Sequence, residues 1–238
     1  VWDGSQLKLC KKEQPEIRKG NQVKVQMYAS GICGTDLNII KKKSRWPLNR
    51  IIGHEGVGTV VEIGEDVTNY QIGDRVIIDP TQYCGKCNYC RVGLTNFCVE
   101  FDKIEVGRAV DGLFAEYYVG EETFIYKIPS DMDWETAILT EPLACVLHNV
   151  DECNIESHHR VLIIGGGPIG ALCALIAAKK AKCCVVIENN IYRNQFLIDR
   201  EINTVNNISE LNNSADCSQE KFDIIIDTVG NQLEIALD

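Results

Sequence analysis

The sequence lacks the features of several protein classes. It has no run of about eighteen apolar residues, so we predict no membrane-spanning helix. It has no internal repeat and no low-complexity segment, and an apolar content of 45 % argues against disorder over most of its 238 residues. Basic residues are outnumbered by acidic ones, 24 against 34, which gives a formal net charge of −10. Because nucleic acid repels such a chain, we expect no nucleic-acid partner.

A secretion signal is also missing from the first residues. The chain begins Val1-Trp2-Asp3-Gly4, without a basic start or an apolar centre. A chain of this length and apolar content needs no disulfide framework in order to fold. We therefore expect a cytoplasmic protein in which the twelve cysteines are reduced thiols.

Four of the cysteines form one tight group, Cys84, Cys87, Cys90 and Cys98. Thiolates packed so closely repel one another unless a cation lies between them, and zinc accepts four sulfurs in tetrahedral geometry. An iron–sulfur cluster is the alternative, because the spacing C-x2-C-x2-C also occurs in ferredoxins. Ferredoxin-type sites usually continue Cys-Pro, whereas Val99 follows Cys98 here. We therefore favour a structural zinc, whose closed four-thiolate shell leaves no position for a substrate.

The two halves of the chain show different secondary-structure patterns. The first half has short stretches of alternating or β-rich residues separated by Gly and Asp turns, which predicts a β-rich domain over residues 1–153. After about residue 155 the pattern becomes buried strand, helix, buried strand, which predicts a parallel sheet over residues 154–238. The predicted strands of this second domain are 161–164, 184–187 and 222–227, and the predicted helices are 171–181 and 190–201. The fold class is α/β.

A glycine-rich turn follows the first buried strand of the second domain. Its residues are Gly165, Gly166, Gly167, Pro168, Ile169 and Gly170. In a dinucleotide-binding turn the first glycine permits the tight bend, the second lets a pyrophosphate approach the backbone, and the third lets helix and strand pack closely. Free amides at the start of the helix then face the phosphate charge. We therefore predict that this turn binds a dinucleotide cofactor.

An acidic residue at the end of the next strand indicates which cofactor this is. Glu188 stands 18 residues beyond Gly170, where a carboxylate accepts hydrogen bonds from ribose hydroxyls and repels a 2′-phosphate. NAD is therefore favoured over NADP. Arg193 is the residue that favours the other choice, because an arginine nearby is what a 2′-phosphate needs.

Three further segments of the first half carry possible metal ligands. They are residues 31–36, with Cys33, Thr35 and Asp36; residues 53–55, with His54 and Glu55; and residues 140–144, with Glu141. Spacing alone does not show that these segments meet in space. A single Cys or His in a strand-rich domain is more often a packing residue than a ligand.

Taken in order, the motifs resemble those of the zinc-dependent medium-chain dehydrogenases, more specifically the sorbitol/threonine dehydrogenase branch. The matching stretches are residues 31–36, 53–55, 67–76, 84–98, 111–119, 141–144 and 161–170. They cover nearly the whole chain in the order that the family shows. The resemblance implies a GroES-like catalytic domain that carries the structural zinc lobe, followed by a Rossmann-type NAD-binding domain that is incomplete at its C-terminal end.

The same resemblance implies a second, catalytic zinc. Cys33 and His54 match its ligands, with Glu55 as a further candidate, and Glu141 matches a glutamate that either ligates directly or holds the zinc-bound water. The charge balance favours the second role, because another direct carboxylate would make the site negative and weaken its Lewis acidity. Asp36 matches the acid that orients the ligand histidine, and Thr35 matches the hydroxyl that accepts the substrate proton. Cys145 offers a competing thiolate near Glu141.

The activity that the resemblance implies is NAD-linked oxidation of a secondary alcohol. The small-molecule substrate would be a polyol, an amino-polyol, an aminocyclitol or a threonine-like compound, and a full-length form would be a homo-oligomer. The zinc would bind the alcohol oxygen at an open position and lower its pKa.

Two features depart from the family pattern. Asn38 stands where the family's proton relay usually has a histidine, and Asn does not titrate near pH 7. The sequence stops at Asp238, before the later strands of a six-stranded dinucleotide fold and the last segment that the family returns to its first domain, so we expect either a fragment of a longer protein or a naturally shortened relative. The alternative function is therefore a non-catalytic relative that acts as a zinc-containing binding module.

Overall fold

The computed structural model describes residues 1–41, 49–213 and 221–230. These residues divide into two compact units, Val1–Glu141 and Pro142–Asp238, each described here by itself. The predicted boundary after residue 153 lies at the end of helix α5 (Thr140–Glu152), so the division comes earlier than expected. The reason is packing, because Val146 and Val150 of this helix are fully buried in one cluster with Val161 and Ile163.

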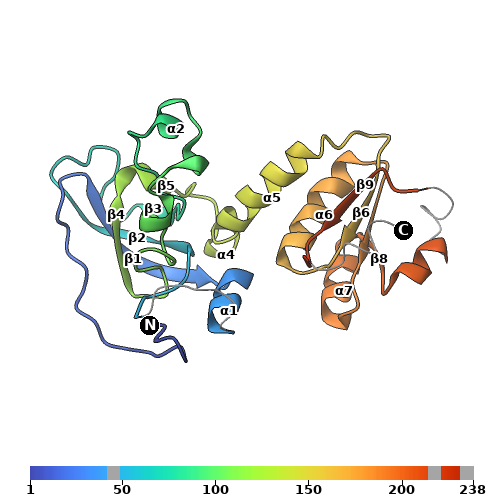
Figure 1. Ribbon diagram of the computed structural model, residues 1–238, viewed down its shortest axis with the longest axis horizontal. Coiled ribbons are helices and arrows are strands. Elements are labelled where there is room, and N and C mark those ends of the chain that lie inside the picture. The colour runs from blue at the N-terminus through green and yellow to red at the C-terminus, as the bar shows by residue number, and fades with distance from the viewer. Residues whose placement is uncertain (42–48, 214–220, 231–238) are drawn as a thin grey trace. The chain divides into compact units, whose positions relative to one another are not determined.

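The first unit is built on an antiparallel sheet of five strands (Figure 1). The strand order is β4-β1-β2-β3-β5, and the bounds are β1 (Gln22–Gly31), β2 (Glu55–Ile63), β3 (Arg75–Ile78), β4 (Tyr117–Glu121) and β5 (Ile125–Lys127). Alternating apolar residues of these strands are fully buried and form the core, among them Val23, Val25, Val60 and Val76. This alternation is the pattern that predicted a β-rich first half.

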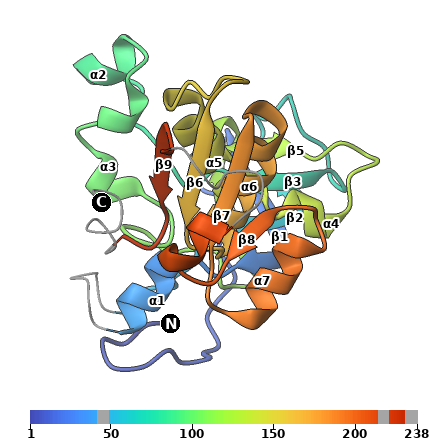
Figure 2. The same cartoon turned by 90° about the vertical axis from the view of Figure 1, so that its right-hand side faces the viewer.

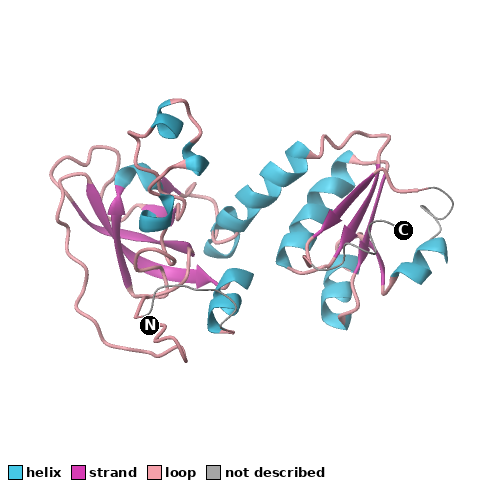
Figure 3. Cartoon of the chain, viewed as in Figure 1, coloured by secondary structure: helices cyan, strands magenta, loops and turns pink. Residues whose placement is uncertain are grey.

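Short helices occupy the connections of the first unit, as the cyan segments of Figure 3 show. Their bounds are α1 (Gly34–Ile40), α2 (Asn88–Arg91), α3 (Phe101–Ile104) and α4 (Trp134–Ala137), with 3-10 turns η1 (Thr95–Phe97) and η2 (Glu122–Phe124). Helix α1 directly follows β1, and α2 lies within the four-cysteine segment. Among the described residues, no helix combines the length and the apolar character needed to cross a membrane.

The second unit contains a parallel sheet of four strands, seen most clearly in Figure 2. The strand order is β8-β7-β6-β9, and the elements are β6 (Arg160–Ile164), α6 (Pro168–Lys180), β7 (Cys183–Ile187), α7 (Ile191–Ile198), β8 (Asn203–Val205), the 3-10 turn η3 (Ile208–Asn213) and β9 (Ile224–Asp227). Every residue of β6 is buried, as expected for a strand covered on both faces. The predicted α/β fold class is therefore confirmed.

Helix α6 starts immediately after the glycine-rich turn. Pro168 occupies its first turn, where a residue without an N–H costs nothing. Ala174 and Ala177 are fully buried, and these small side chains let the helix approach the sheet closely. Helix α7 is capped by Asn190, whose side chain accepts hydrogen bonds from the backbone N–H groups of Tyr192 and Arg193, both at 3.1 Å. One pocket of the second unit is bordered by the ends of β6 and β7 and by the first residues around α6 and α7.

Candidate functional site

The four predicted cysteines converge in the loop that carries α2. Their sulfur atoms, those of Cys84, Cys87, Cys90 and Cys98, all lie within 4.8 Å of one another. Backbone N–H groups point at these sulfurs: Cys90 N–H donates to Cys87 Sγ at 3.5 Å, and Cys84 N–H donates to Cys98 Sγ at 3.3 Å. Such donors stabilise thiolates, which are the forms that bind metals.

The cysteines of this group cannot all ionise without a cation. The backbone N–H groups of Cys90 and Val99 lower the pKa of Cys87 to about 6. Burial, together with the adjacent thiols of Cys87 and Cys98, raises the pKa of Cys90 to about 12. A divalent cation at the centre removes this conflict, and four sulfurs at mutual contact suit tetrahedral zinc. The donor set therefore fits the expected structural zinc.

A second group of ligand atoms forms where β1 meets β2. Cys33 follows β1 and is the N-cap of α1, while His54 and Glu55 stand at the start of β2. The antiparallel pairing of the two strands sets Gly31 opposite Glu55, which brings Cys33 close to both residues. The sulfur, one ring nitrogen and one carboxylate oxygen of Cys33, His54 and Glu55 lie within 4.8 Å of one another. The register of β1 and β2 thus brings together residues that lie far apart in the sequence.

Asp36 lies beside two of these three residues, Cys33 and His54. It is fully buried, and its Oδ2 accepts a hydrogen bond from the Cys33 backbone N–H at 2.9 Å. Its Oδ1 lies 3.8 Å from His54 Nδ1, and neither of these two atoms has a hydrogen-bond partner in the described structure. Nδ1 of the imidazole faces the carboxylate, so Nε2 is the nitrogen left for a metal, which is the usual arrangement of a ligand histidine beside an acid.

The charged forms of Cys33 and His54 stabilise each other. The His54 ring lowers the pKa of the Cys33 thiol, with a contribution from the Thr35 backbone and hydroxyl. Burial alone would lower the pKa of His54, but Cys33, Asp36 and Glu141 outweigh it and raise this pKa to about 9. Burial raises the pKa of Glu55. A set of one thiolate, one imidazole and one carboxylate suits zinc and leaves room for a further ligand.

The remaining predicted residues lie around this group with different placements. Glu141 is half-buried in the first turn of α5, and burial together with the nearby carboxylates of Glu55, Asp79 and Asp36 raises its pKa, while His54 acts in the opposite direction. Thr35 is half-buried in the first turn of α1, two residues after Cys33. Asn38 and Cys145 are exposed.

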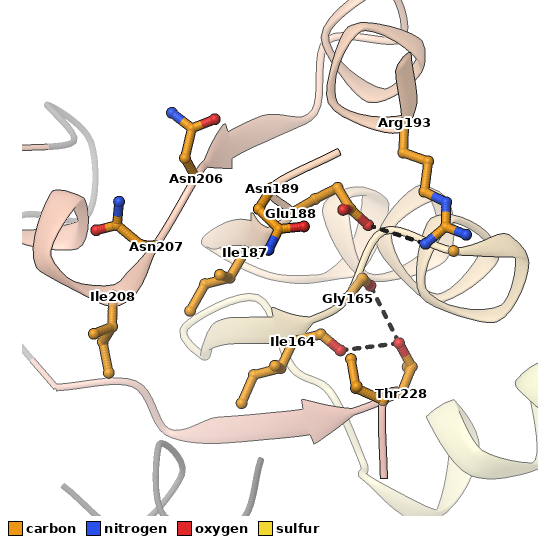
Figure 4. A pocket seen from close by; sticks show the side chains of 12 residues that line it. Ile164, Gly165, Ile187, Glu188, Asn189, Arg193, Asn206, Asn207, Ile208 and Thr228 are labelled. Atoms are coloured by element: carbon orange, nitrogen blue, oxygen red, sulfur yellow. Dashed lines mark hydrogen bonds and ion pairs between the residues drawn. The ribbon is translucent and has the colours of Figure 1, made fainter. Parts of the chain in front are cut away.

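Three of the six predicted cofactor residues line a pocket of about 500 Å³ in the second unit, and the other three, Pro168, Ile169 and Gly170, do not (Figure 4). The pocket is bordered by Gly165 and Gly167 of the turn, by Glu188 after β7, and by Arg193 of α7. Pro168 and Ile169, at the start of α6, are exposed. The pocket therefore lies at the carboxyl ends of parallel strands, where open α/β sheets bind ligands.

The three glycines of the turn have three different environments. Gly165 has a φ of +95°, which favours glycine. A Cβ on Gly170 would lie 1.9 Å from the carbonyl oxygen of Gly165, so only glycine fits between helix and strand. A Cβ on Gly167 would meet nothing closer than the Arg193 Nη1 at 3.8 Å, so the space over this residue is open. These environments match the bend, the close packing and the open approach expected of a dinucleotide turn.

Glu188 is buried and held by the backbone on both sides. Its Oε2 accepts a hydrogen bond from the Gly166 N–H at 2.8 Å, and its Oε1 accepts one from the Asn190 N–H at 2.7 Å. Arg193 Nη1 lies 3.7 Å from Oε2, as the dashed line in Figure 4 shows. The acidic residue and the arginine that favour opposite cofactors are thus neighbours.

One residue that sequence reasoning missed is Thr228, directly after β9. Its hydroxyl donates to the carbonyl oxygens of Ile164, at 2.9 Å, and Gly165, at 3.1 Å, and so braces the glycine-rich turn (Figure 4). The available signal was a polar residue at the carboxyl end of a predicted parallel strand.

Comparison with known proteins extends these observations to the level of a family. Residues 19–130 match the alcohol dehydrogenase GroES-like domain. A sorbitol dehydrogenase of Halalkalibacterium halodurans is 36 % identical over 69 % of this chain and 48 % of its own length. A sorbitol dehydrogenase of Bombyx mori is 32 % identical over 90 % of this chain and 58 % of its own length. The chain therefore spans about half the length of these curated relatives.

Solved structures agree in fold across both units. A protein from Sinorhizobium meliloti 1021, assigned as a zinc-binding dehydrogenase and solved bound to NADP, is 29 % identical with a TM-score of 0.79 over 90 % of this chain and 64 % of its own. An alcohol dehydrogenase from Escherichia coli CFT073, solved with NADH, is 28 % identical with a TM-score of 0.83 over 95 % of this chain and 67 % of its own.

Proposed function

Since this chain belongs to the zinc-dependent medium-chain dehydrogenase/reductase family, we propose that it is an oxidoreductase that transfers a hydride from a secondary alcohol to NAD. The substrate class is a polyol, an amino-polyol, an aminocyclitol or a threonine-like alcohol. The observation that carries the proposal is the meeting of Cys33, His54 and Glu55 within 4.8 Å, beside a fully buried Asp36. A set of three such side chains leaves a fourth position of a tetrahedral zinc open to a substrate, whereas the closed set of four cysteines does not.

In this proposal the residues of the first unit hold a catalytic zinc and prepare the alcohol. Cys33 and His54 are ligands, and Glu55 and Glu141 supply the carboxylates around them. When bound, zinc supplies Lewis acidity that makes the alcohol hydroxyl more acidic. Asp36 would keep the His54 ring oriented, and the Thr35 hydroxyl would accept the alcohol proton while it passes its own proton on to water. The carbon that bears the hydroxyl would then give its hydride to the nicotinamide ring, and its C–O bond would become a carbonyl.

The proton cannot leave through Asn38, because its amide does not titrate. Asn38 is exposed on α1, so water reaches this end of the helix. We propose that water takes the place of a protein relay after Thr35.

The cofactor in this proposal is NAD rather than NADP. Glu188 places a buried carboxylate beside the glycine-rich turn, where it accepts hydrogen bonds from ribose and repels a 2′-phosphate. Arg193 is mostly exposed and 3.7 Å from that carboxylate, so its positive charge is partly compensated. NAD preference therefore depends on Glu188 keeping its charge.

Glu188→Gln is expected to weaken this preference. Glutamine retains an oxygen that can accept the Gly166 N–H, but it removes the negative charge and leaves Arg193 without its counter-ion. The ratio of NADPH to NADH dissociation constants, measured by fluorescence titration, should fall by about tenfold, equivalent to about 1.4 kcal/mol. Arg193→Gln is the matched control and should weaken NADPH alone. A ratio unchanged in Glu188→Gln would contradict the assignment.

The test of the proposed reaction is NADH formation by the zinc-loaded protein. Sorbitol, xylitol, threonine and an aminocyclitol are supplied with NAD, and absorbance of NADH is followed. At least one substrate should be oxidised by the wild type and none by Cys33→Ser, which removes a proposed zinc ligand. No NADH with any substrate would overturn the reaction.

A binding module without catalysis is the second candidate. It is favoured by Asn38, which stands where the family's proton relay usually has a histidine. Zinc content and NADH binding distinguish the two candidates. A module would carry two zinc ions per chain and bind no NADH, whereas the oxidoreductase would carry two zinc ions and also bind NADH.

Metal uptake at the second group should depend on pH. Because the pKa of His54 is about 9 without metal, the ring must lose a proton before it ligates at any lower pH. The apparent affinity for Co²⁺ should therefore rise from pH 6 towards pH 9, by about tenfold per pH unit for each proton released, and then level off. The cobalt–thiolate absorption that Cys33→Ser removes reports this site. A pH-independent affinity would contradict the raised pKa.

A further inference from the structure

Glu55 reaches the second metal group by crossing the face of Gly31. The two residues are directly opposite each other in the β1–β2 pair. A Cβ built on Gly31 would lie 2.0 Å from Glu55 Oε2, 3.1 Å from its Cδ and 3.0 Å from its Cβ. Opposite Cβ atoms of an ordinary antiparallel pair are about 4.5–5.5 Å apart. The Glu55 side chain therefore occupies the volume that any other residue at position 31 would need.

The Glu55 side chain points towards the second metal group. Cys33 lies two residues beyond Gly31, and its sulfur, a carboxylate oxygen of Glu55 and a ring nitrogen of His54 lie within 4.8 Å of one another. The strand around Glu55 is fixed independently, because the Ser30 hydroxyl donates to the Glu55 carbonyl oxygen at 2.7 Å. The backbone at Glu55 is therefore held in place, and only the direction of its side chain remains to be fixed. The side chain runs through the space that a Cβ at position 31 would occupy.

We infer that Gly31 is a positioning residue, whose missing side chain lets the Glu55 carboxylate stand beside Cys33 and His54 as a metal ligand. This inference rests on the proposed function, since it needs a metal at that group. A methyl group at position 31 would push the carboxylate away from the cluster, while the backbone itself could still form β1.

Gly34 provides the matched control. It lies three residues further along the same segment, at the start of α1, and a Cβ built on it would meet no atom within 4 Å. Gly34→Ala therefore adds the same methyl group on the other side of Cys33 without touching Glu55.

The experiment measures Co²⁺ affinity at the second group through the cobalt–thiolate absorption that Cys33→Ser abolishes. Gly31→Ala should weaken Co²⁺ binding by about 10- to 100-fold, the usual effect of disturbing a residue that supports a metal ligand. Gly34→Ala should leave the affinity at the wild-type value. Equal affinities of Gly31→Ala and the wild type would overturn the inference while the metal site stands. Absence of the absorption in the wild type would overturn the proposed function itself.

A double-variant cycle separates positioning from damage to the strand. Glu55→Gly removes all three atoms that a Cβ at position 31 would meet. If Gly31 acts through Glu55, Gly31→Ala should cause no further loss of Co²⁺ affinity in the Glu55→Gly background. If the losses add, Gly31 matters for the β1–β2 pair rather than for the carboxylate, and the inference fails. Thermal unfolding of each variant verifies that the folded protein is compared.

Discussion

Gly170→Ala is expected to unfold the parallel-sheet unit or to destabilise it by about 3 kcal/mol or more. The new Cβ would lie 1.9 Å from the carbonyl oxygen of Gly165 and 2.9 Å from the Thr228 hydroxyl. Neither the carbonyl nor the hydroxyl can yield easily, because Thr228 Oγ1 donates to that same carbonyl and to the carbonyl of Ile164. Helix α6 must then move away from β6. Loss of hydrogen-exchange protection in α6 and β6 would report the change.

Gly167→Ala is the comparison variant, because we expect it to weaken NADH binding without destabilising the fold. Gly167 has a φ of −67°, and its Cβ would meet only the flexible end of Arg193 at 3.8 Å. The fold should therefore remain intact, while NADH binding weakens by about tenfold or more, equivalent to about 1.4 kcal/mol. If both variants unfold alike, or if Gly167→Ala binds NADH as the wild type does, the division of roles between the two glycines is wrong.

The elements that sequence patterns predicted well are those whose signal is local. The buried run at 161–164 is β6, and the predicted helix 190–201 contains α7, which starts after its Asn190 cap. The cysteine lobe also depends on short spacing, and its four sulfurs do meet. The domain boundary was less visible, because the apolar face of α5 carries no sign of which sheet it will cover. Only the packing of Val146 and Val150 assigns that helix to the second unit.

The second metal group shows what local patterns leave open. Cys33 and His54 are 21 positions apart, and their meeting depends on the register that sets Gly31 opposite Glu55. Register is a property of two strands together, so no single segment reveals it. The resemblance to a family supplied the ligand roles, and the structure supplies their proximity. The roles of Thr35 and Glu141 stay predictions.

Cys98→Ser is expected to unfold the cysteine lobe while both sheets stay folded. All residues from 84 to 99 are described, and Cys98 alone among them is buried. The apolar side chains of the lobe are exposed by 46 to 70 %; they are Tyr89, Val92, Leu94, Phe97 and Val99. A segment without an apolar core depends on its metal, which in small zinc domains contributes about 10–16 kcal/mol of apparent binding energy. Removing one of four thiolates takes most of that contribution away.

Trypsin gives a direct readout of this unfolding, because Lys86 and Arg91 are exposed on the lobe. Cys98→Ser should lose one zinc equivalent and be cut at both residues, whereas the zinc-loaded wild type should resist. Cys10→Ser is the matched control, since Cys10 is an exposed thiol outside the lobe. An uncut Cys98→Ser that keeps all its zinc would show that the lobe does not depend on this ion. Visible absorption from iron in the purified wild type would instead assign the four thiolates to an iron–sulfur cluster.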